Sequence, residues 1–199
     1  MCLLFHKTES KPKERLKGPY IIIANHSSYL DIPFMYQTAR KSPFLFLGKS
    51  ELLKWPGMGL LFKKYNIPVY RKNRKQAVES INKAKQEIKN GWSIAIFPEG
   101  TIPHSAPKMI RFKNGAFKLA IETGTPILPI TYVDSWKIFT DPEDTFGYAH
   151  PGIVRSVIHD PIETKDLTEE DLVSLRERCF EVINAPLLKR HGKIIENEN

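Results

Sequence analysis

A histidine and an aspartate in the first part of the chain are spaced so that they could share a proton. His26 and Asp31 lie five residues apart, directly after the apolar run at 20–24. An imidazole changes its charge near physiological pH, so it can act as a general base. An aspartate one helical turn further on can accept a hydrogen bond from the other ring nitrogen, which fixes the tautomer and stabilises the imidazolium. The pair therefore indicates proton abstraction, unless the two side chains only cap a turn.

The turn at 97–101, Phe-Pro-Glu-Gly-Thr, is a second candidate site and also follows an apolar run. Gly100 permits a ligand to approach the backbone closely, and the exposed amides of the turn could meet an anion. Glu99 could position a substrate hydroxyl or a basic side chain. A simple turn at the end of a strand is the alternative interpretation.

Arg71 is a third candidate, because it stands in a basic cluster after a short apolar run. The other members of the cluster are Lys72, Arg74 and Lys75. A guanidinium binds phosphate through two parallel N–H groups, so an arginine at the end of a strand can clamp a phosphate. A solvated, charged start of a helix is the alternative.

The elements that must position these residues alternate between strands and helices. Apolar runs predict strands at 20–24, 67–70, 92–97, 126–133 and 154–159. The spacing of apolar residues predicts helices at about 27–39, 75–89, 114–122 and 168–184. This alternation favours a single-domain α/β fold with a mixed, largely parallel sheet flanked by helices. Ligands bind such sheets at the carboxyl ends of the strands, where His26 and Glu99 stand.

Several local features add to this expectation. Ser27 or Ser28 is a plausible N-cap for the first helix. Pro129 requires a bulge or a sheet edge, because proline has no N–H to donate to a neighbouring strand. The last helix has an acidic first turn and an apolar face, formed by Leu172, Leu175, Cys179 and Val182. We expect one domain over 1–199, with a core at about 18–185, a basic N-terminal arm or short helix within 1–17, and a polar tail at 188–199.

Composition narrows the class of protein. The chain has 199 residues, of which 41% are hydrophobic and 26% charged, as in one ordinary globular domain. Its two cysteines, Cys2 and Cys179, are too few for a disulfide framework, and its histidines lack the spacing of zinc ligands. No apolar run reaches the roughly 18 residues of a transmembrane helix. The apolar start at 1–6 is too short for a signal peptide.

The positive charge is concentrated in one half of the chain. Residues 1–100 carry 18 Lys and Arg against 7 Asp and Glu, whereas 101–199 carry 12 against 15, so the net charge of +8 comes from the first half. This asymmetry indicates an anionic partner: nucleic acid, an acidic membrane or a phosphorylated substrate. The run at 43–65 interleaves lysines with Phe, Leu and Trp55, which suits a surface that contacts anionic lipid but also an ordinary core.

In their order along the chain, four blocks resemble the lysophosphatidic acid acyltransferase (acylglycerol-phosphate acyltransferase) family of glycerolipid acyltransferases. These blocks are 25–31 (Asn-His-Ser-Ser-Tyr-Leu-Asp), 67–71 (Ile-Pro-Val-Tyr-Arg), 97–101 and 125–130 (Thr-Pro-Ile-Leu-Pro-Ile). The resemblance implies that His26 and Asp31 are catalytic. It also implies a set of substrate-binding residues: Asn25, Arg71, Glu99, Gly100 and Thr101. Ile102 stands where the family commonly has an arginine, which makes Lys108 and Arg111 further candidates for a phosphate contact.

The resemblance also implies a reaction and its partners. His26 would take the proton from a lysophospholipid hydroxyl, in the first instance that of lysophosphatidic acid, as the oxygen attacks an acyl thioester. The donor would be acyl-CoA or an acyl carrier protein thioester. Because a thioester is already activated, no cofactor and no metal are expected. We expect peripheral association with the cytoplasmic face of a membrane and no nucleic-acid partner.

Other functions remain open on the sequence alone. Within the same chemistry, the acceptor could be a lyso-ornithine lipid or a lipid A precursor. A non-enzymatic basic protein that binds membranes or nucleic acid would also account for the charge, although no nucleic-acid motif is recognisable. An inactive relative would not need both His26 and Asp31. A covalent acyl-enzyme on Ser27 or Ser28 is disfavoured, because a serine next to His26 in sequence cannot easily meet its ring.

Overall fold

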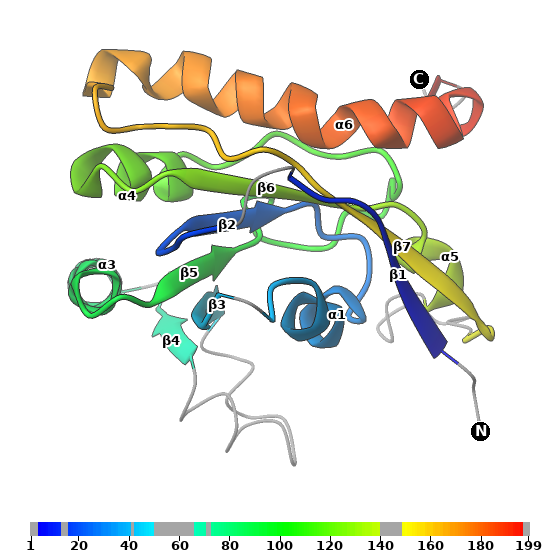
Figure 1. The fold of residues 1–199 in the computed structure, drawn as a ribbon, viewed down its shortest axis with the longest axis horizontal. Helices are drawn as coiled ribbons and strands as arrows, with labels where there is room; N and C mark the ends of the chain where they lie inside the picture. Colours follow the sequence, from blue (N-terminus) through cyan, green and yellow to red (C-terminus); the bar gives the residue numbers. More distant parts are fainter. Residues whose placement is uncertain are drawn as a thin grey trace.

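Seven strands in the described part of the chain form one sheet (Figure 1). The computed structural model describes residues 4–12, 16–40, 42–49, 66–70, 73–139 and 149–196. Along the chain the strands are β1 (Leu4–Ser10), β2 (Ile21–Ala24), β3 (Phe44–Lys49), β4 (Asn66–Val69), β5 (Ser93–Ile96), β6 (Ile127–Tyr132) and β7 (Gly152–Ile158). Their order in the sheet is β1-β7-β6-β2-β5-β3-β4. Every neighbouring pair is parallel except β6 and β7, so the predicted largely parallel sheet is confirmed.

Helices cover both faces of the sheet. They are α1 (Asp31–Thr38), α3 (Arg74–Lys89), α4 (Gly115–Thr123), α5 (Ser135–Ile138), the 3-10 turn η2 (Glu169–Asp171) and α6 (Leu172–Glu196). In Figure 1, α4 and α6 lie above the central strands and α1 lies below them. The helices predicted at 75–89 and 114–122 are confirmed as α3 and α4, with boundaries shifted by one residue.

The central position of β2 explains its unbroken apolar sequence. Each of its four residues is completely buried, because β5 and β6 flank the strand and helices cover both of its faces. Alternate side chains point to opposite faces of a strand. Accordingly, Ile21 and Ile23 join the core formed with α3, α4 and α6, whereas Ile22 and Ala24 join the core formed with α1. The loop after β2 is therefore anchored in two hydrophobic cores.

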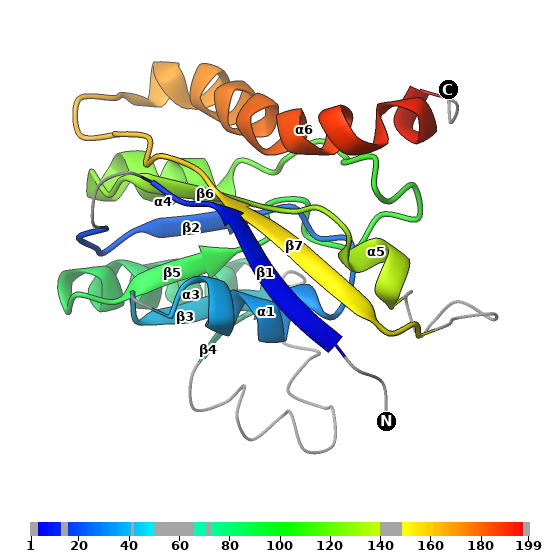
Figure 2. The same ribbon diagram turned by 45° about the vertical axis from the view of Figure 1, so that its right-hand side comes forward.

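The first described residues form a strand, which corrects the predicted basic arm or short helix within 1–17. β1 is an edge strand that pairs in parallel with β7, and Figure 2 shows the two strands side by side. His6 and Thr8 are half-buried, while the other residues of the strand are exposed. An edge strand tolerates such polar residues, because only one side of it meets another strand. The polarity of residues 7–10 alone therefore does not predict β1, whose half-buried and exposed residues alternate at 5–9.

The predicted polar tail at 188–199 is also wrong for the residues that the structure describes. α6 continues to Glu196, well beyond the predicted end at 184, with Pro186 inside it. Buried side chains recur every four residues along this extension, at Leu187, His191 and Ile195. This spacing keeps one face of the helix on the core while the polar residues face solvent. On the same face Ile183 is buried, rather than the predicted Val182.

The prediction that Pro129 needs a bulge or a sheet edge is wrong, since β6 lies inside the sheet. Pro129 pairs with Ile23 of β2 in unbroken register. On the other side of β6, the antiparallel ladder with β7 begins one residue later, at Ile130 and Ile158. The proline precedes this ladder, so no ladder bond is lost, and its carbonyl still accepts a hydrogen bond from the backbone N–H of His159.

The run at 43–65 is an interior element where the structure describes it. Phe44–Lys49 form β3, an unpredicted strand between β5 and β4. Phe44 and Phe46 are buried in the core next to α1. The core interpretation therefore holds for these residues. The rest of the run, 50–65, lies outside the described residues.

Candidate active site

Two loops from distant parts of the sequence meet because their strands are neighbours. β2 and β5 run parallel, with Ile23 opposite Ile96. The loop that carries His26 follows β2, and the turn at 97–101 follows β5, so both leave the sheet at the same edge. This edge, at the carboxyl ends of the strands, is where open α/β sheets bind ligands. The backbone of His26 and the side chain of Glu99 are in direct contact there.

His26 and Asp31 form a hydrogen-bonded pair. Nδ1 of His26 lies 3.0 Å from Oδ2 of Asp31. Because an ionised carboxylate can only accept, Nδ1 carries the proton of the neutral ring and Nε2 keeps its lone pair. The side chain of His26 is 13% exposed, and no described residue hydrogen-bonds its Nε2. The imidazole is therefore arranged to accept a proton from a bound molecule.

The carboxylate of Asp31 holds the loop as well as the histidine. The side chain is fully buried, and its Oδ2 accepts hydrogen bonds from the backbone N–H groups of Ser27 at 2.7 Å and Ser28 at 2.9 Å. The prediction of a serine N-cap is wrong, because the N-cap of α1 is Leu30 and no side chain caps it. Asp31 is the first residue of the helix, where the helix dipole favours negative charge. One oxygen thus fixes the orientation of the ring relative to the backbone.

A stacked phenylalanine fixes the plane of the His26 ring. Phe97 lies parallel to the imidazole, with 4.1 Å between the ring centroids and 13° between the planes. Phe46 of β3 stacks on Phe97 in turn, at 5.8 Å. In the sequence, Phe97 is recognisable only as part of a turn. Its position directly before Pro98 was visible, but its contact with His26 depends on β5 lying beside β2.

Glu99 binds backbone groups and is not directed at a substrate. Its Oε1 accepts a hydrogen bond from the N–H of His26 at 2.8 Å, and its Oε2 accepts one from the N–H of Ile110 at 3.0 Å. Only 1% of the residue is exposed. Burial raises the pKa of Glu99 to about 7, although the two hydrogen bonds favour the ionised form. The predicted contact with a substrate hydroxyl or a basic side chain is therefore replaced by a contact that ties the two loops together.

Asn25 also has a structural position. Its Nδ2 donates to the carbonyl of Tyr132 at 2.9 Å, and its Oδ1 accepts from the N–H of Tyr132 at 2.8 Å. The residue is 1% exposed. This closed pair of hydrogen bonds joins the end of β2 to the end of β6, directly before His26. The predicted role of Asn25 in binding substrate finds no support in this geometry. Its contact with Tyr132 has no local signal in the sequence, because the two residues lie 107 positions apart.

The remaining predicted binding residues lie around the turn after β5 or outside the described residues. Gly100 has a φ of 77°, which favours glycine, and Thr101 is exposed. Of the two alternatives for a phosphate contact, Arg111 is exposed and Lys108 is half-buried. Arg71 lies outside the described residues, so its role stays a prediction.

Two further predictions concern the reactivity of Cys179 and the absence of a metal site. Cys179 is buried in α6, and burial raises the pKa of its thiol to about 12. A thiol with so little thiolate is a poor nucleophile, in agreement with the prediction that it is inert. Over the residues that the structure describes, no three His, Cys, Asp or Glu side chains gather in a way that could hold a metal ion.

A parallel α/β sheet with a hydrogen-bonded His-Asp pair at its carboxyl edge defines a class of proteins that can deprotonate a hydroxyl. A family model described as Acyltransferase matches residues 2–133. The chain belongs to this acyltransferase family, as the four sequence blocks predicted.

Known relatives share most of this chain. A chloroplastic 1-acyl-sn-glycerol-3-phosphate acyltransferase, BAT2 of Brassica napus, is 31% identical over 79% of the chain and 46% of its own length. The 1-acyl-sn-glycerol-3-phosphate acyltransferase of Saccharomyces cerevisiae is 32% identical over 81% of the chain and 53% of its own. The chain thus spans about half the length of these relatives. The crystal structure of the 1-acyl-sn-glycerophosphate (LPA) acyltransferase PlsC from Thermotoga maritima matches with a TM-score of 0.72 and 28% identity, over 94% of this chain and 72% of that one.

Proposed function

We propose that the protein transfers a fatty acyl group from a thioester to the free hydroxyl of lysophosphatidic acid, which gives phosphatidic acid. The observation that carries this proposal is the His26–Asp31 pair, whose Nε2 has no hydrogen-bond partner among the described residues. The activities named for the relatives from Brassica napus and Saccharomyces cerevisiae support this acceptor.

The geometry suits a direct transfer with His26 as the base. Nε2 takes the proton of the acceptor hydroxyl as its oxygen forms a bond to the thioester carbonyl carbon. The tetrahedral intermediate then collapses, the carbon–sulfur bond breaks, and the imidazolium returns the proton to the leaving thiolate. Only Oδ2 of Asp31 is hydrogen-bonded, while its Oδ1 is buried with no partner in the described part of the chain. The carboxylate therefore gains stabilisation when the ring becomes positive.

The two serines beside His26 support direct transfer over a covalent acyl-enzyme. The Oγ of Ser27 lies 2.9 Å from the Oγ of Ser135, and the Oγ of Ser28 donates to the carbonyl of Phe139 at 2.8 Å. Both serines are buried. Neither hydroxyl is hydrogen-bonded to Nε2 of His26, so the imidazole does not activate either of them as a nucleophile.

The thioester donor, acyl-CoA or acylated acyl carrier protein, is a co-substrate, and we propose that no cofactor or metal is needed. A thioester carbonyl is already activated toward attack by an oxygen nucleophile. The residues required from the protein are then a base and groups that bind the two substrates. Arg71 is the proposed contact to the acceptor phosphate, since a guanidinium matches phosphate geometry.

We propose that the protein works as a peripheral protein at the cytoplasmic face of a membrane, where its acceptor resides, and binds no nucleic acid. The excess of positive charge in residues 1–100 favours contact with anionic lipid. None of the described helices is both long and apolar enough to cross a bilayer. The interfacial contact proposed for Trp55 lies outside the described residues.

The experiment that tests this function offers purified protein a panel of lysolipids with acyl-CoA and acyl carrier protein donors, and detects products by mass spectrometry. We expect phosphatidic acid from lysophosphatidic acid, and none with His26→Ala. Acylation of only a lyso-ornithine lipid or a lipid A precursor would retain the chemistry and replace the acceptor. If the folded protein acylates no lysolipid with either donor, the proposal fails.

A further inference from the structure

The short helix α5 contacts the loop that carries His26, although it follows a different strand. The Oγ of Ser135, the first residue of α5, lies 2.9 Å from the Oγ of Ser27, so the two hydroxyls share a hydrogen bond. Phe139, directly after α5, accepts a hydrogen bond through its carbonyl from the Oγ of Ser28. Both ends of α5 are therefore attached to the two residues that follow the proposed base in sequence.

Ser27 also contacts the carboxylate that orients the proposed base. The backbone N–H of Ser27 donates to Oδ2 of Asp31 at 2.7 Å. The same oxygen lies 3.0 Å from Nδ1 of His26. Because one oxygen accepts both hydrogen bonds, a displacement of Ser27 moves the carboxylate relative to the imidazole. Ser135 is thus connected to the imidazole through three successive hydrogen bonds.

The hydroxyl pair is enclosed by protein. Ser135 is fully buried, and only 7% of Ser27 is exposed. Within the described residues, neither hydroxyl forms another hydrogen bond. A buried hydroxyl without a partner costs free energy, so each of the two depends on the other. The pair therefore holds Ser27 in the orientation in which its N–H meets Asp31.

α5 is itself anchored on β7, so it can support the loop. The carboxylate of Asp134, directly before α5, binds Arg155 of β7 through two hydrogen bonds. A bidentate pair of this kind fixes direction as well as distance. At the other end of the helix, the carbonyl of Ile138 accepts a hydrogen bond from the N–H of His150 at 2.8 Å. The side chain of Ile138 is buried in the core next to α1.

We propose that Ser135 is a positioning residue for acyl transfer. Its hydroxyl fixes Ser27, and the N–H of Ser27 then holds the carboxylate of Asp31 against Nδ1 of His26. Within the described part of the chain, the hydroxyl of Ser135 bonds to neither His26 nor Asp31, so it acts through Ser27. This inference rests on the proposed function, because it assigns Ser135 a part in the same reaction.

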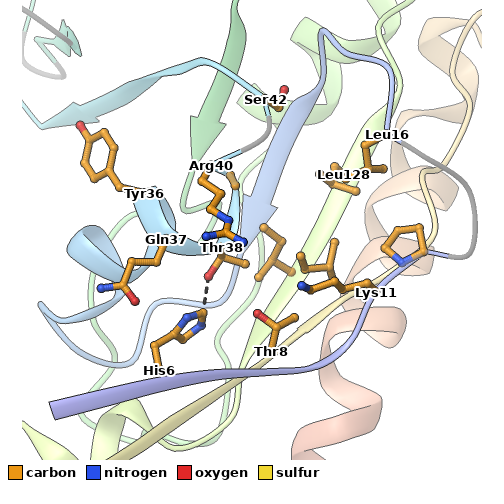
Figure 3. A pocket seen from close by; sticks show the side chains of 14 residues that line it. His6, Thr8, Lys11, Leu16, Tyr36, Gln37, Thr38, Arg40, Ser42 and Leu128 are labelled. Atoms are coloured by element: carbon orange, nitrogen blue, oxygen red, sulfur yellow. Dashed lines mark hydrogen bonds between the residues drawn. The ribbon is translucent and has the colours of Figure 1, made fainter.

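A second pair of buried serines provides the matched control. The Oγ of Ser42 lies 2.7 Å from the Oγ of Ser93, and Ser42 is 7% exposed. Ser42 follows the C-terminal end of α1, beside a cavity that no residue of 25–31 lines (Figure 3). Ser42→Ala therefore removes the same kind of hydrogen bond as Ser135→Ala, but away from the loop that carries the proposed base.

Steady-state kinetics of acyl transfer from a thioester to lysophosphatidic acid test the proposal. Ser135→Ala should lower kcat by roughly 10-fold to 100-fold, with little change in either KM, since a small misplacement of a catalytic group can cost that much. Ser27→Ala breaks the same hydrogen bond and should give a similar loss. In the double variant the two losses should not multiply, because partners in one hydrogen bond are coupled. Ser42→Ala should retain the kcat of wild type.

NMR of nitrogen-labelled histidine detects the position of the ring without turnover. The Nδ1–H of His26, identified by its absence in His26→Ala, should give a slowly exchanging proton signal in wild type and in Ser42→Ala. In Ser135→Ala we expect this signal to broaden or disappear through exchange with water. Because the measurement needs no substrate, it decides the role of Ser135 even if wild type acylates no lysolipid, an outcome that would reject the proposed function.

Circular dichroism and urea unfolding establish that each variant is folded. If Ser135→Ala does not fold, Ser27→Ala applies the same kinetic and NMR tests from the other side of the hydrogen bond. A kcat of Ser135→Ala equal to that of Ser42→Ala, losses that multiply in the double variant, or an unchanged His26 signal would each overturn the proposal.

Discussion

The carboxylate of Glu99 accepts a hydrogen bond from the backbone N–H of His26 at 2.8 Å, across 73 residues of sequence. Its other oxygen binds the N–H of Ile110. Glu99 is therefore a positioning residue, which ties the loop that carries His26 to the segment that carries Ile110. Desolvation is the main reason that its pKa is raised to about 7, so this contact titrates close to neutral pH.

The first prediction concerns the pH dependence of stability. A carboxyl whose pKa is higher in the folded protein than in the unfolded chain binds more protons when folded, so it stabilises the fold as the pH falls from about 7 to 4.5. His159 acts in the opposite direction, because burial lowers its pKa to about 4. In Glu99→Gln this stabilisation is lost, while the opposing effect of His159 remains. The free energy of unfolding of this variant should fall more steeply below pH 7 than that of wild type, by on the order of 3 kcal/mol over the whole window.

Urea unfolding at a series of pH values measures this difference. The variant Glu87→Gln is the control, since Glu87 lies on α3 away from the loop, and its curve should run parallel to that of wild type. Parallel curves for Glu99→Gln and wild type would contradict the raised pKa of Glu99.

The second prediction concerns the proposed base. His26→Ala should lower kcat for acyl transfer by about 10²–10⁴, because loss of a general base typically costs that much. Asp31→Asn should also be severe, since the charge that stabilises the imidazolium is lost. KM values should change little in both. His150→Ala is the matched control with full activity, and a folded His26→Ala protein with near-normal turnover would rule out the assignment.

The third prediction concerns the pair of hydrogen bonds between Asn25 and Tyr132. Asn25→Ala leaves a buried N–H and a buried carbonyl of Tyr132 without partners, each at a cost of about 1–3 kcal/mol. We expect a loss of about 2–4 kcal/mol in the free energy of unfolding, measured by urea denaturation. Asn90→Ala, at an exposed helix end, should stay within about 0.5 kcal/mol. An equally small loss for Asn25→Ala would show that the contact with Tyr132 does not hold the loop.

The fourth prediction concerns Arg71. Arg71→Ala should raise the KM for lysophosphatidic acid far more than the KM for the thioester donor, because the acceptor carries its phosphate close to the attacking hydroxyl. Steady-state kinetics with each substrate varied in turn measures the two KM values separately. Lys75→Ala is the control. Equal effects on both KM values would assign Arg71 a structural role and make Lys108 and Arg111 the next residues to test.

The fifth prediction concerns membrane contact. The basic first half of the chain should give binding to anionic vesicles that weakens with salt, at about 1 kcal/mol per Lys or Arg near the surface. The apolar run around Trp55 should add a component of vesicle binding that persists at high salt. Trp55→Ala should reduce this component. Sedimentation with zwitterionic and anionic vesicles at low and high salt separates the two parts. Binding to DNA or RNA without binding to any vesicle would favour the nucleic-acid alternative.

The sequence by itself determined those features that depend on neighbouring residues. A run such as Ile-Ile-Ile-Ala suits a strand buried on both faces, so the existence of β2 and its burial followed from side-chain type. His26 lies in the loop after β2, and Asp31, five residues later, is the first residue of α1. Because the two residues are so close in sequence, their contact needs no other part of the fold. Amphipathic spacing likewise determined α3 and α4.

The tertiary structure alone decided which distant groups meet. Glu99 and Phe97 reach His26 only because β5 lies beside β2, and Tyr132 reaches Asn25 only because β6 lies on its other side. The order of strands in a sheet arises from packing between elements, which no local pattern records. For the same reason the polarity of β1 and of the end of α6 was misleading: each segment is stabilised by a neighbour distant in sequence, β7 in the first case and the core of the sheet in the second.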